Sequence, residues 1–287
     1  MIVGGDRDAV ISNIQRCAES GDFNCKVETN DPVLTSEQDR DIINQYLENQ
    51  SSFNFHAKTC LAMAVTDIVT KKINRNTEVV GLEKLPSDIM GMMITSNHFG
   101  PLENTVIRYF SSRYLHKKLS VICQTSNYAM TGFIGFFMNY ARTIPISTNP
   151  RYLARNFPAI LKEKIIDKNE CVLIYPEQEM WFNYKKPRPP KNGAYFYSAK
   201  LNFPILSCFV EMIDKNEPEN DEFNKVDYRL HVLGVLYPDK NKTTSENIEE
   251  LAKKDYDMKR ACYETVYGKP LDYTFSPSDI AGYKKGL

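Results

Sequence analysis

The sequence has no long hydrophobic run and no excess of charge of either sign. No stretch approaches the roughly 20 consecutive apolar residues that a membrane-spanning helix needs, and the N-terminus lacks the basic-then-apolar pattern of a secretory signal. The 36 basic and 36 acidic side chains give a formal net charge of zero, whereas nucleic-acid-binding proteins usually carry a basic excess. We therefore expect a protein that neither spans a membrane nor binds nucleic acid.

Several common catalytic signatures are missing as well. There is no Gly-x-Ser-x-Gly turn, which argues against a serine nucleophile of that type. There is no glycine-rich phosphate loop, which argues against a nucleotide-binding transferase. The sequence has no Cys-x-x-Cys, and its four histidines, at positions 56, 98, 116 and 231, are far apart. We therefore expect no metal site and no bound cofactor.

The seven cysteines are scattered along the chain and odd in number. Several lie in apolar strand patterns, as Cys171 and Cys208 do, where a thiol behaves as a small hydrophobic side chain. This distribution indicates a reducing cytoplasm rather than a framework of disulfide bonds.

Alternating strand and helix patterns through residues 78–212 predict an α/β fold with a mostly parallel, mixed sheet flanked by helices. Three helical patterns within residues 1–75 predict an N-terminal helical region packing on an α/β domain in residues 76–287, which ends in a charged helix. The third helix has an apolar middle and a basic end, which fits either core packing or a membrane-interface helix. The acidic residues 214–227 are expected to form an exposed hairpin loop.

Residues 90–104 carry the most informative pattern. The apolar residues 92–95 predict a buried strand, and the Gly100-Pro101 pair predicts a break followed by the start of a helix. His98 then lies in the turn at the carboxyl end of the strand, where open α/β sheets bind ligands. Glu103 falls in the first helical turn, where the helix dipole favours a carboxylate.

His98 and Glu103 have complementary chemistry. An imidazole can accept a proton at neutral pH, and a carboxylate bonded to its other ring nitrogen fixes the tautomer and stabilises the imidazolium. On one continuous helix, residues five apart point roughly 140° apart, so the two side chains meet only if His98 lies outside the helix. The other interpretation is a loop histidine and an ordinary first-turn glutamate.

This stretch resembles the first motif of the glycerolipid (lysophospholipid) acyltransferases, which include the 1-acylglycerol-3-phosphate acyltransferases. That motif is Asn-His, four residues and an acid, which is usually Asp. Here Asn97-His98 is followed by Glu103, which is one methylene longer. The resemblance covers roughly residues 76–212.

The family's third motif, Phe-Pro-Glu-Gly-Thr-Arg after an apolar strand, is similar to Tyr175-Pro176-Glu177 in this chain. The next residues, Gln178-Glu179-Met180, replace Gly-Thr-Arg, so the arginine that usually contacts phosphate has no counterpart.

Other cations near the motifs are candidates for that phosphate contact. Arg142 and Arg151 flank the short predicted strand 143–146, in a region that resembles the family's second motif. Three more cations lie in the aromatic and proline-rich segment 181–193, namely Lys185, Lys186 and Arg188. For each of these five side chains, a solvated surface position is the other interpretation.

The resemblance implies an O-acyltransferase that moves a fatty acyl group from acyl-CoA or acyl-carrier protein to a hydroxyl of a lysophospholipid such as 1-acylglycerol-3-phosphate. In this interpretation His98 takes the hydroxyl proton and Glu103 orients His98. Asn97 helps to bind the acceptor, and Glu177 positions the acceptor or the neighbouring loop.

The thioester is a co-substrate, so no other cofactor is implied. A lipid substrate implies a peripheral protein on the inner, cytoplasmic face of the cell membrane. The alternative is a catalytically degenerate family member that binds lipid or a protein partner, which the altered third motif favours.

Overall fold

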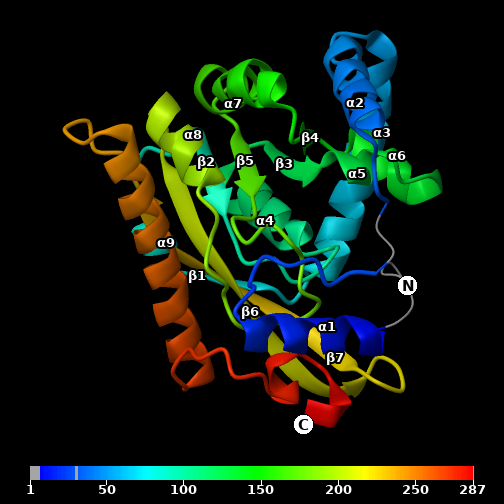
Figure 1. The fold of residues 1–287 in the computed structure, drawn as a ribbon, viewed down its shortest axis with the longest axis vertical. Coiled ribbons are helices and arrows are strands. Elements are labelled where there is room, and N and C mark those ends of the chain that lie inside the picture. The colour runs from blue at the N-terminus through cyan, green and yellow to red at the C-terminus, as the bar shows by residue number, and fades with distance from the viewer. Residues whose placement is uncertain (1–6, 30–31, 287) are drawn as a thin grey trace.

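Seven strands form one sheet in the order β1-β7-β6-β2-β5-β3-β4 (Figure 1). The computed structural model describes residues 7–29 and 32–286. The strands are β1 (Glu78–Val80), β2 (Met92–Thr95), β3 (Leu119–Gln124), β4 (Thr143–Ile146), β5 (Cys171–Ile174), β6 (Ile205–Pro218) and β7 (Asn224–Leu236). The helices are α1 (Arg7–Ser20), α2 (Ser36–Asn49), α3 (Phe53–Ile73), α4 (Asn104–Phe110), α5 (Thr125–Tyr128), α6 (Gly132–Tyr140), α7 (Phe157–Leu161), α8 (Gly193–Leu201) and α9 (Thr244–Tyr267).

The predicted mostly parallel, mixed sheet is confirmed. Strands β6, β2, β5, β3 and β4 run parallel to one another, and β7 is antiparallel to β6. The carboxyl ends of these five parallel strands therefore lie along one edge of the sheet, which we call the carboxyl edge. The opposite, amino edge holds the starts of the same strands.

Both faces of the sheet are covered, which explains why its central strands are apolar throughout. Alternate residues of β2 point to opposite faces, so Met93 packs with residues of α2, α7, α8 and α9, whereas Met92 and Ile94 pack with α4. Every residue of β2 and β5 is buried. This packing fixes the residues that directly follow the two strands at the carboxyl edge.

The N-terminal helices pack at two separate places. Helix α1 and the loop after it join a cluster with Trp181, Phe182 and the C-terminal segment, and Figure 1 shows α1 beside that segment, coloured red. Helix α2 contributes Ile43 and Tyr46 to the cluster on the α8 face. Residues 1–6, where the signal pattern is absent, lie outside the described residues.

One segment differs from its predicted structure, and the C-terminal tail is more buried than a surface loop. Most of the stretch 214–227, expected as a loop, continues β6 and β7 as a long hairpin, because paired charges such as Lys215 and Asp227, 2.6 Å apart, replace apolar cross-strand contacts. The tail after α9 has little regular structure, yet it buries Asp279, Ile280 and Ala281.

Cys17 and Cys25 form a disulfide bond, with their Cα atoms 6.4 Å apart. The scattered cysteine pattern did not predict this pair. Gly21 follows α1 with a φ of 73°, a left-handed conformation that glycine adopts at no steric cost, and the turn brings Cys25 back to the last turns of α1. No helix among residues 7–29 and 32–286 has the length and apolar character that crossing a membrane requires.

Candidate active site

Strand β2 ends three residues before His98. Asn97 lies beyond the end of the strand, and its side chain continues the contact between β2 and β6. The strand ladder between them stops at Thr95 and Ser207, but the Asn97 amide donates to the Val210 carbonyl (3.0 Å) and accepts from the Val210 N–H (2.8 Å). Asn97 is 2% exposed. Its amide therefore holds the chain next to His98 in place, which differs from the substrate contact expected from the sequence.

The structure brings His98 and Glu103 together. His98 Nδ1 is hydrogen-bonded to Glu103 Oε1, and the second carboxylate oxygen accepts the N–H groups of Phe99 and Gly100, the latter at 2.8 Å. Glu103 immediately precedes α4 and is 4% exposed. The main-chain donors hold this carboxylate beside the imidazole at the N-terminus of α4.

This arrangement determines what each imidazole nitrogen can do. An ionised carboxylate only accepts hydrogen bonds, so Nδ1 of His98 carries the proton that Glu103 accepts. The neutral tautomer then has its lone pair on Nε2, the atom that can take a proton from a substrate. The His98 side chain is 21% exposed, so it is partly accessible while its carboxylate partner is buried.

Tyr175, which sequence analysis did not select, stacks on the imidazole. It directly follows β5, the parallel neighbour of β2, and its ring centroid lies 4.1 Å from that of His98 at an interplanar angle of 6°. Burial, followed by the charge of Glu103, raises the pKa of its hydroxyl well above the usual value. In the sequence, the only sign of this contact was that an aromatic residue directly follows a predicted buried strand.

Glu177 and Arg188 form a buried pair behind the imidazole. The Glu177 carboxylate accepts the His98 main-chain N–H at 3.2 Å and the Arg188 guanidinium at 2.9 Å. Arg188 is 2% exposed, lies 4.4 Å above the Trp181 ring, and donates to the Phe23 carbonyl at 2.9 Å. Glu177 thus positions the neighbouring loop and His98, and the Arg188 guanidinium is already bonded within the protein.

The two lysines of the same loop are also buried and paired. Lys185 Nζ lies 2.7 Å from Asp214, and Lys186 Nζ lies 2.7 Å from Asp279. Both acids lie far from segment 181–193 in the sequence, so the segment looked like a run of unpaired cations. For that reason it predicted an anion-binding loop. The fold instead neutralises both lysines, and their expected contact with an acceptor phosphate finds no support in this geometry.

Arg142 and Arg151 lie at different edges of the sheet. Arg142 directly precedes β4 at the amino edge, where its guanidinium lies 2.5 Å from Glu170. The sequence interpretation required Arg142 to lie beside His98, and the structure places it at the opposite edge. Arg151 follows β4 on the carboxyl side and is exposed, so its charge is available at the edge that carries His98.

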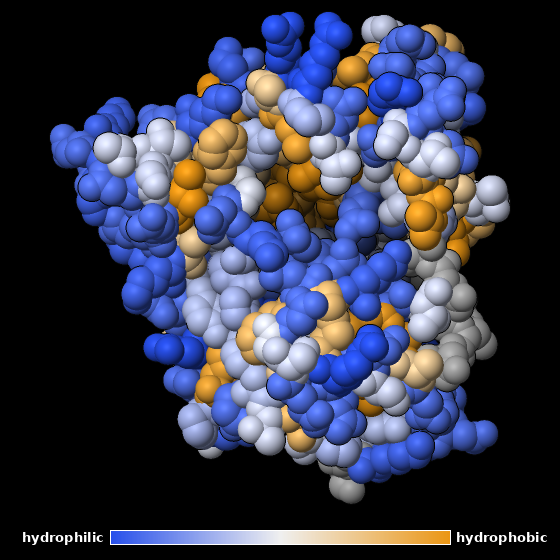
Figure 2. All heavy atoms as spheres, viewed as in Figure 1, coloured by the Kyte–Doolittle hydropathy of each residue, from blue (hydrophilic) through white to orange (hydrophobic). Residues whose placement is uncertain are grey.

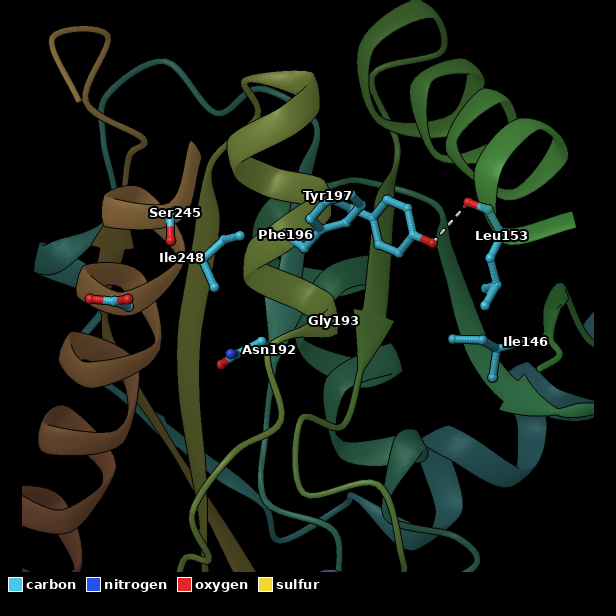
Figure 3. A pocket seen from close by; sticks show the side chains of 9 residues that line it. Ile146, Leu153, Asn192, Gly193, Phe196, Tyr197, Ser245 and Ile248 are labelled. Carbon is cyan, nitrogen blue, oxygen red and sulfur yellow. Dashed lines mark hydrogen bonds between the residues drawn. The ribbon is translucent and has the colours of Figure 1, made fainter. Parts of the chain in front are cut away.

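A mostly apolar pocket of about 440 Å³ opens at the same edge. Figure 3 shows Ile146 from the end of β4, Phe196 and Tyr197 from α8, and Ile248 from α9 around it, with the Tyr197 hydroxyl donating to the Leu153 carbonyl at 3.1 Å. Figure 2 shows a hollow lined by hydrophobic atoms on the same side of the molecule. Among the described residues, no group of three or more His, Cys, Asp or Glu side chains is arranged to hold a metal ion.

Comparisons with known proteins show what the sequence and the fold are similar to. Residues 76–211 match the family model described as Acyltransferase, and no curated protein matches the chain. The fold is similar to that of the 1-acyl-sn-glycerophosphate (LPA) acyltransferase PlsC from Thermotoga maritima, with a TM-score of 0.50 and 14% sequence identity over 81% of this chain and 90% of that one. Residues 76–211 thus resemble the acyltransferase family in sequence, and the fold of the chain agrees with that of a solved acyltransferase.

Proposed function

We propose that this enzyme transfers a fatty acyl group from an acyl thioester, acyl-CoA or acyl-carrier protein, to a hydroxyl of a lysophospholipid. The contact between His98 and the buried Glu103 carries the proposal, because it leaves one imidazole nitrogen free to act as a base at a partly exposed position. A protein that only binds lipid has no need of that pair, so the structure does not favour the degenerate alternative.

In the proposed reaction the acceptor hydroxyl attacks the thioester carbonyl while His98 Nε2 takes its proton. The C–O bond forms, the tetrahedral intermediate collapses, and the C–S bond breaks. The imidazolium then returns its proton to the departing thiolate, so the enzyme ends in its starting state. Glu103 stabilises the imidazolium throughout, and the stacked Tyr175 restricts the orientation of the ring.

Two features of the carboxyl edge, where His98 lies, suit the two substrates. The apolar pocket lined by Ile146, Phe196 and Ile248 has the size and lining that a fatty acyl chain requires. The exposed Arg151 supplies a cation at the same edge for the anionic headgroup of the acceptor. The structural neighbour acts on 1-acyl-sn-glycerophosphate, and we propose an acceptor of that class for this chain.

We further propose that the enzyme works on a membrane surface. On α3, Phe53, Leu61 and Ile68 are 88%, 60% and 68% exposed, and their spacing of seven or eight residues puts them on one side of the helix. Phe133 of α6 is 74% exposed. Exposed apolar side chains of this size favour insertion at the boundary of a lipid layer.

The cytoplasmic face of the cell membrane is the proposed location. Five of the seven cysteines are free thiols, as the sequence analysis expected of a reducing compartment. The disulfide between Cys17 and Cys25 weighs against this location, because cytosolic disulfides are rare. Alkylation of the two thiols in intact cells, read by mass, tests it.

The proposed reaction is tested by incubating the purified enzyme with a panel of lysophospholipids and acyl thioesters and measuring product mass. We expect a diacyl product from at least one anionic lysophospholipid. Transfer only to acceptors without a phosphate, or thioester hydrolysis without transfer, would contradict the proposal.

A further inference from the structure

A second cavity, of about 530 Å³, lies at the amino edge of the sheet, away from His98. It is bordered by α2 and α3, by the starts of β3 and β4, and by the helical turn Lys162–Asp167 before β5. Arg142 lines it from the position just before β4. Its φ of 55° is in the left-handed region, which is unusual and strained for a residue other than glycine.

The charges around this cavity do not balance. Four cations line it, namely Lys118, Arg142, Lys164 and Lys168, but it has only two carboxylates among its lining residues, Glu163 and Glu170. Arg142 lies 2.5 Å from Glu170, and Lys168 lies 2.5 Å from Glu163.

The remaining two cations are poorly compensated. Lys164 reaches the same Glu163 oxygen only at 4.0 Å, and no ion pair involves Lys118 among the described residues. Burial, followed by repulsion from Lys168, lowers the pKa of Lys164. A bound anion would pair with these two cations and would favour the charged form of Lys164.

Unpaired hydrogen-bond donors point to the same conclusion. Arg142 Nε and Thr59 Oγ1 are buried and have no hydrogen-bond partner among the described residues, and both residues line the cavity. Buried donors of this kind are normally satisfied, and leaving one unpaired costs about 1–3 kcal/mol. An oxyanion with several acceptor oxygens would pair with these donors.

We propose that this amino-edge cavity binds a phosphate-bearing ligand at a site separate from the acyl-transfer centre. The phosphate group would lie against Arg142, Lys164 and Lys118, and the aromatic side chains of Tyr46 and Phe55 would border the rest of the ligand. This role gives Arg142 a function at the edge where the structure places it.

The phosphate can come from a phospholipid headgroup or from a soluble phosphate compound. Helix α3 contributes Phe55 and Thr59 to the cavity and also carries the exposed Phe53 and Leu61. A headgroup in the cavity would therefore lie beside the apolar side chains that we expect to enter the lipid layer.

The test is calorimetric titration of the full chain with inorganic phosphate and with glycerol 3-phosphate. We expect Lys118→Gln and Lys164→Gln each to weaken binding by about tenfold, because each removes one charged hydrogen bond. Lys162→Gln is the matched control. Lys162 is on the same helical turn as Lys164, is 58% exposed and does not line the cavity. Lys118 is exposed, so its substitution keeps the test valid if the Lys164 variant fails to fold.

A second measurement separates the two phosphate sources. Binding of each variant to phosphatidylcholine vesicles, with and without phosphatidylglycerol, is measured by sedimentation. Loss of the preference for anionic vesicles in the Lys118 and Lys164 variants identifies a lipid headgroup, and an unchanged preference with weakened glycerol 3-phosphate binding identifies a soluble ligand. No phosphate binding by the wild-type chain, or equal binding by the wild type and both variants, overturns the proposal whether or not the enzyme transfers acyl groups.

Discussion

The two edges of the sheet pair their cations differently. At the carboxyl edge, Arg188 is paired with Glu177, and Lys186 with Asp279, so each buried cation has an acid within the protein. At the amino edge, four cations share two carboxylates around an open cavity. A cation with a buried partner supports the fold, whereas a cation without one is available to a ligand.

This difference changes which cations are assigned to binding. The basic loop beside the third motif would be the obvious anion site if charge alone decided the question. The cations of this loop form ion pairs that hold the loop against His98. The cations that are not fully paired lie at the amino edge or, like Arg151, on the surface. Substitutions at Glu103, Arg188 and Arg151 test these assignments.

Glu103→Gln should lower kcat for acyl transfer by about 10²–10⁴-fold, the usual contribution of general-base catalysis. The amide keeps the shape of the side chain but loses the charge that stabilises the imidazolium. Glu103→Asp is the matched control and should retain measurable transfer. If Glu103→Gln transfers at the wild-type rate, Glu103 serves only the start of α4.

Arg188→Met should destabilise the protein by about 3–5 kcal/mol, measured by denaturant unfolding, because it leaves the buried Glu177 carboxylate without its cation. Adding Glu177→Gln should recover part of that loss. The exposed control Arg151→Met should change stability by less than about 0.5 kcal/mol. Equal effects of Arg188→Met and Arg151→Met would contradict the supporting role assigned to the buried pair.

Arg151→Gln should raise the KM for an anionic lysophospholipid by about tenfold, as expected for loss of one charged hydrogen bond. The KM for the acyl thioester should change less. Arg155, also exposed and one turn along the same helical segment, provides the control variant Arg155→Gln. Steady-state kinetics with both substrates make this comparison, and an unchanged acceptor KM in Arg151→Gln would remove Arg151 from the site.

Sequence reasoning succeeded where the determining interactions are local. The apolar run of β2, the Gly100-Pro101 break and the spacing from His98 to Glu103 all lie within 15 residues, and the structure brings the two side chains together. The alternation of strands and helices likewise predicted the mixed sheet, because each element carries its own periodicity.

The partners of the loop cations could not be predicted in the same way. Asp214 and Asp279 lie 29 and 93 residues after Lys185 and Lys186 in the chain, and only the folded tail and hairpin bring them close. The stacking of Tyr175 on His98 depends on the pairing of β5 with β2. The Cys17–Cys25 bond depends on the turn at Gly21, which the count of cysteines does not show.

His98→Ala removes the imidazole that we propose as the general base. His116→Asn is the matched control, because His116 is exposed and its φ of 53° suits asparagine. The measurement is kcat for acyl transfer, with thermal unfolding to establish that both variants are folded. We predict a loss of about 10²–10⁴-fold for His98→Ala and a wild-type rate for His116→Asn; transfer by folded His98→Ala at the wild-type rate would contradict the account.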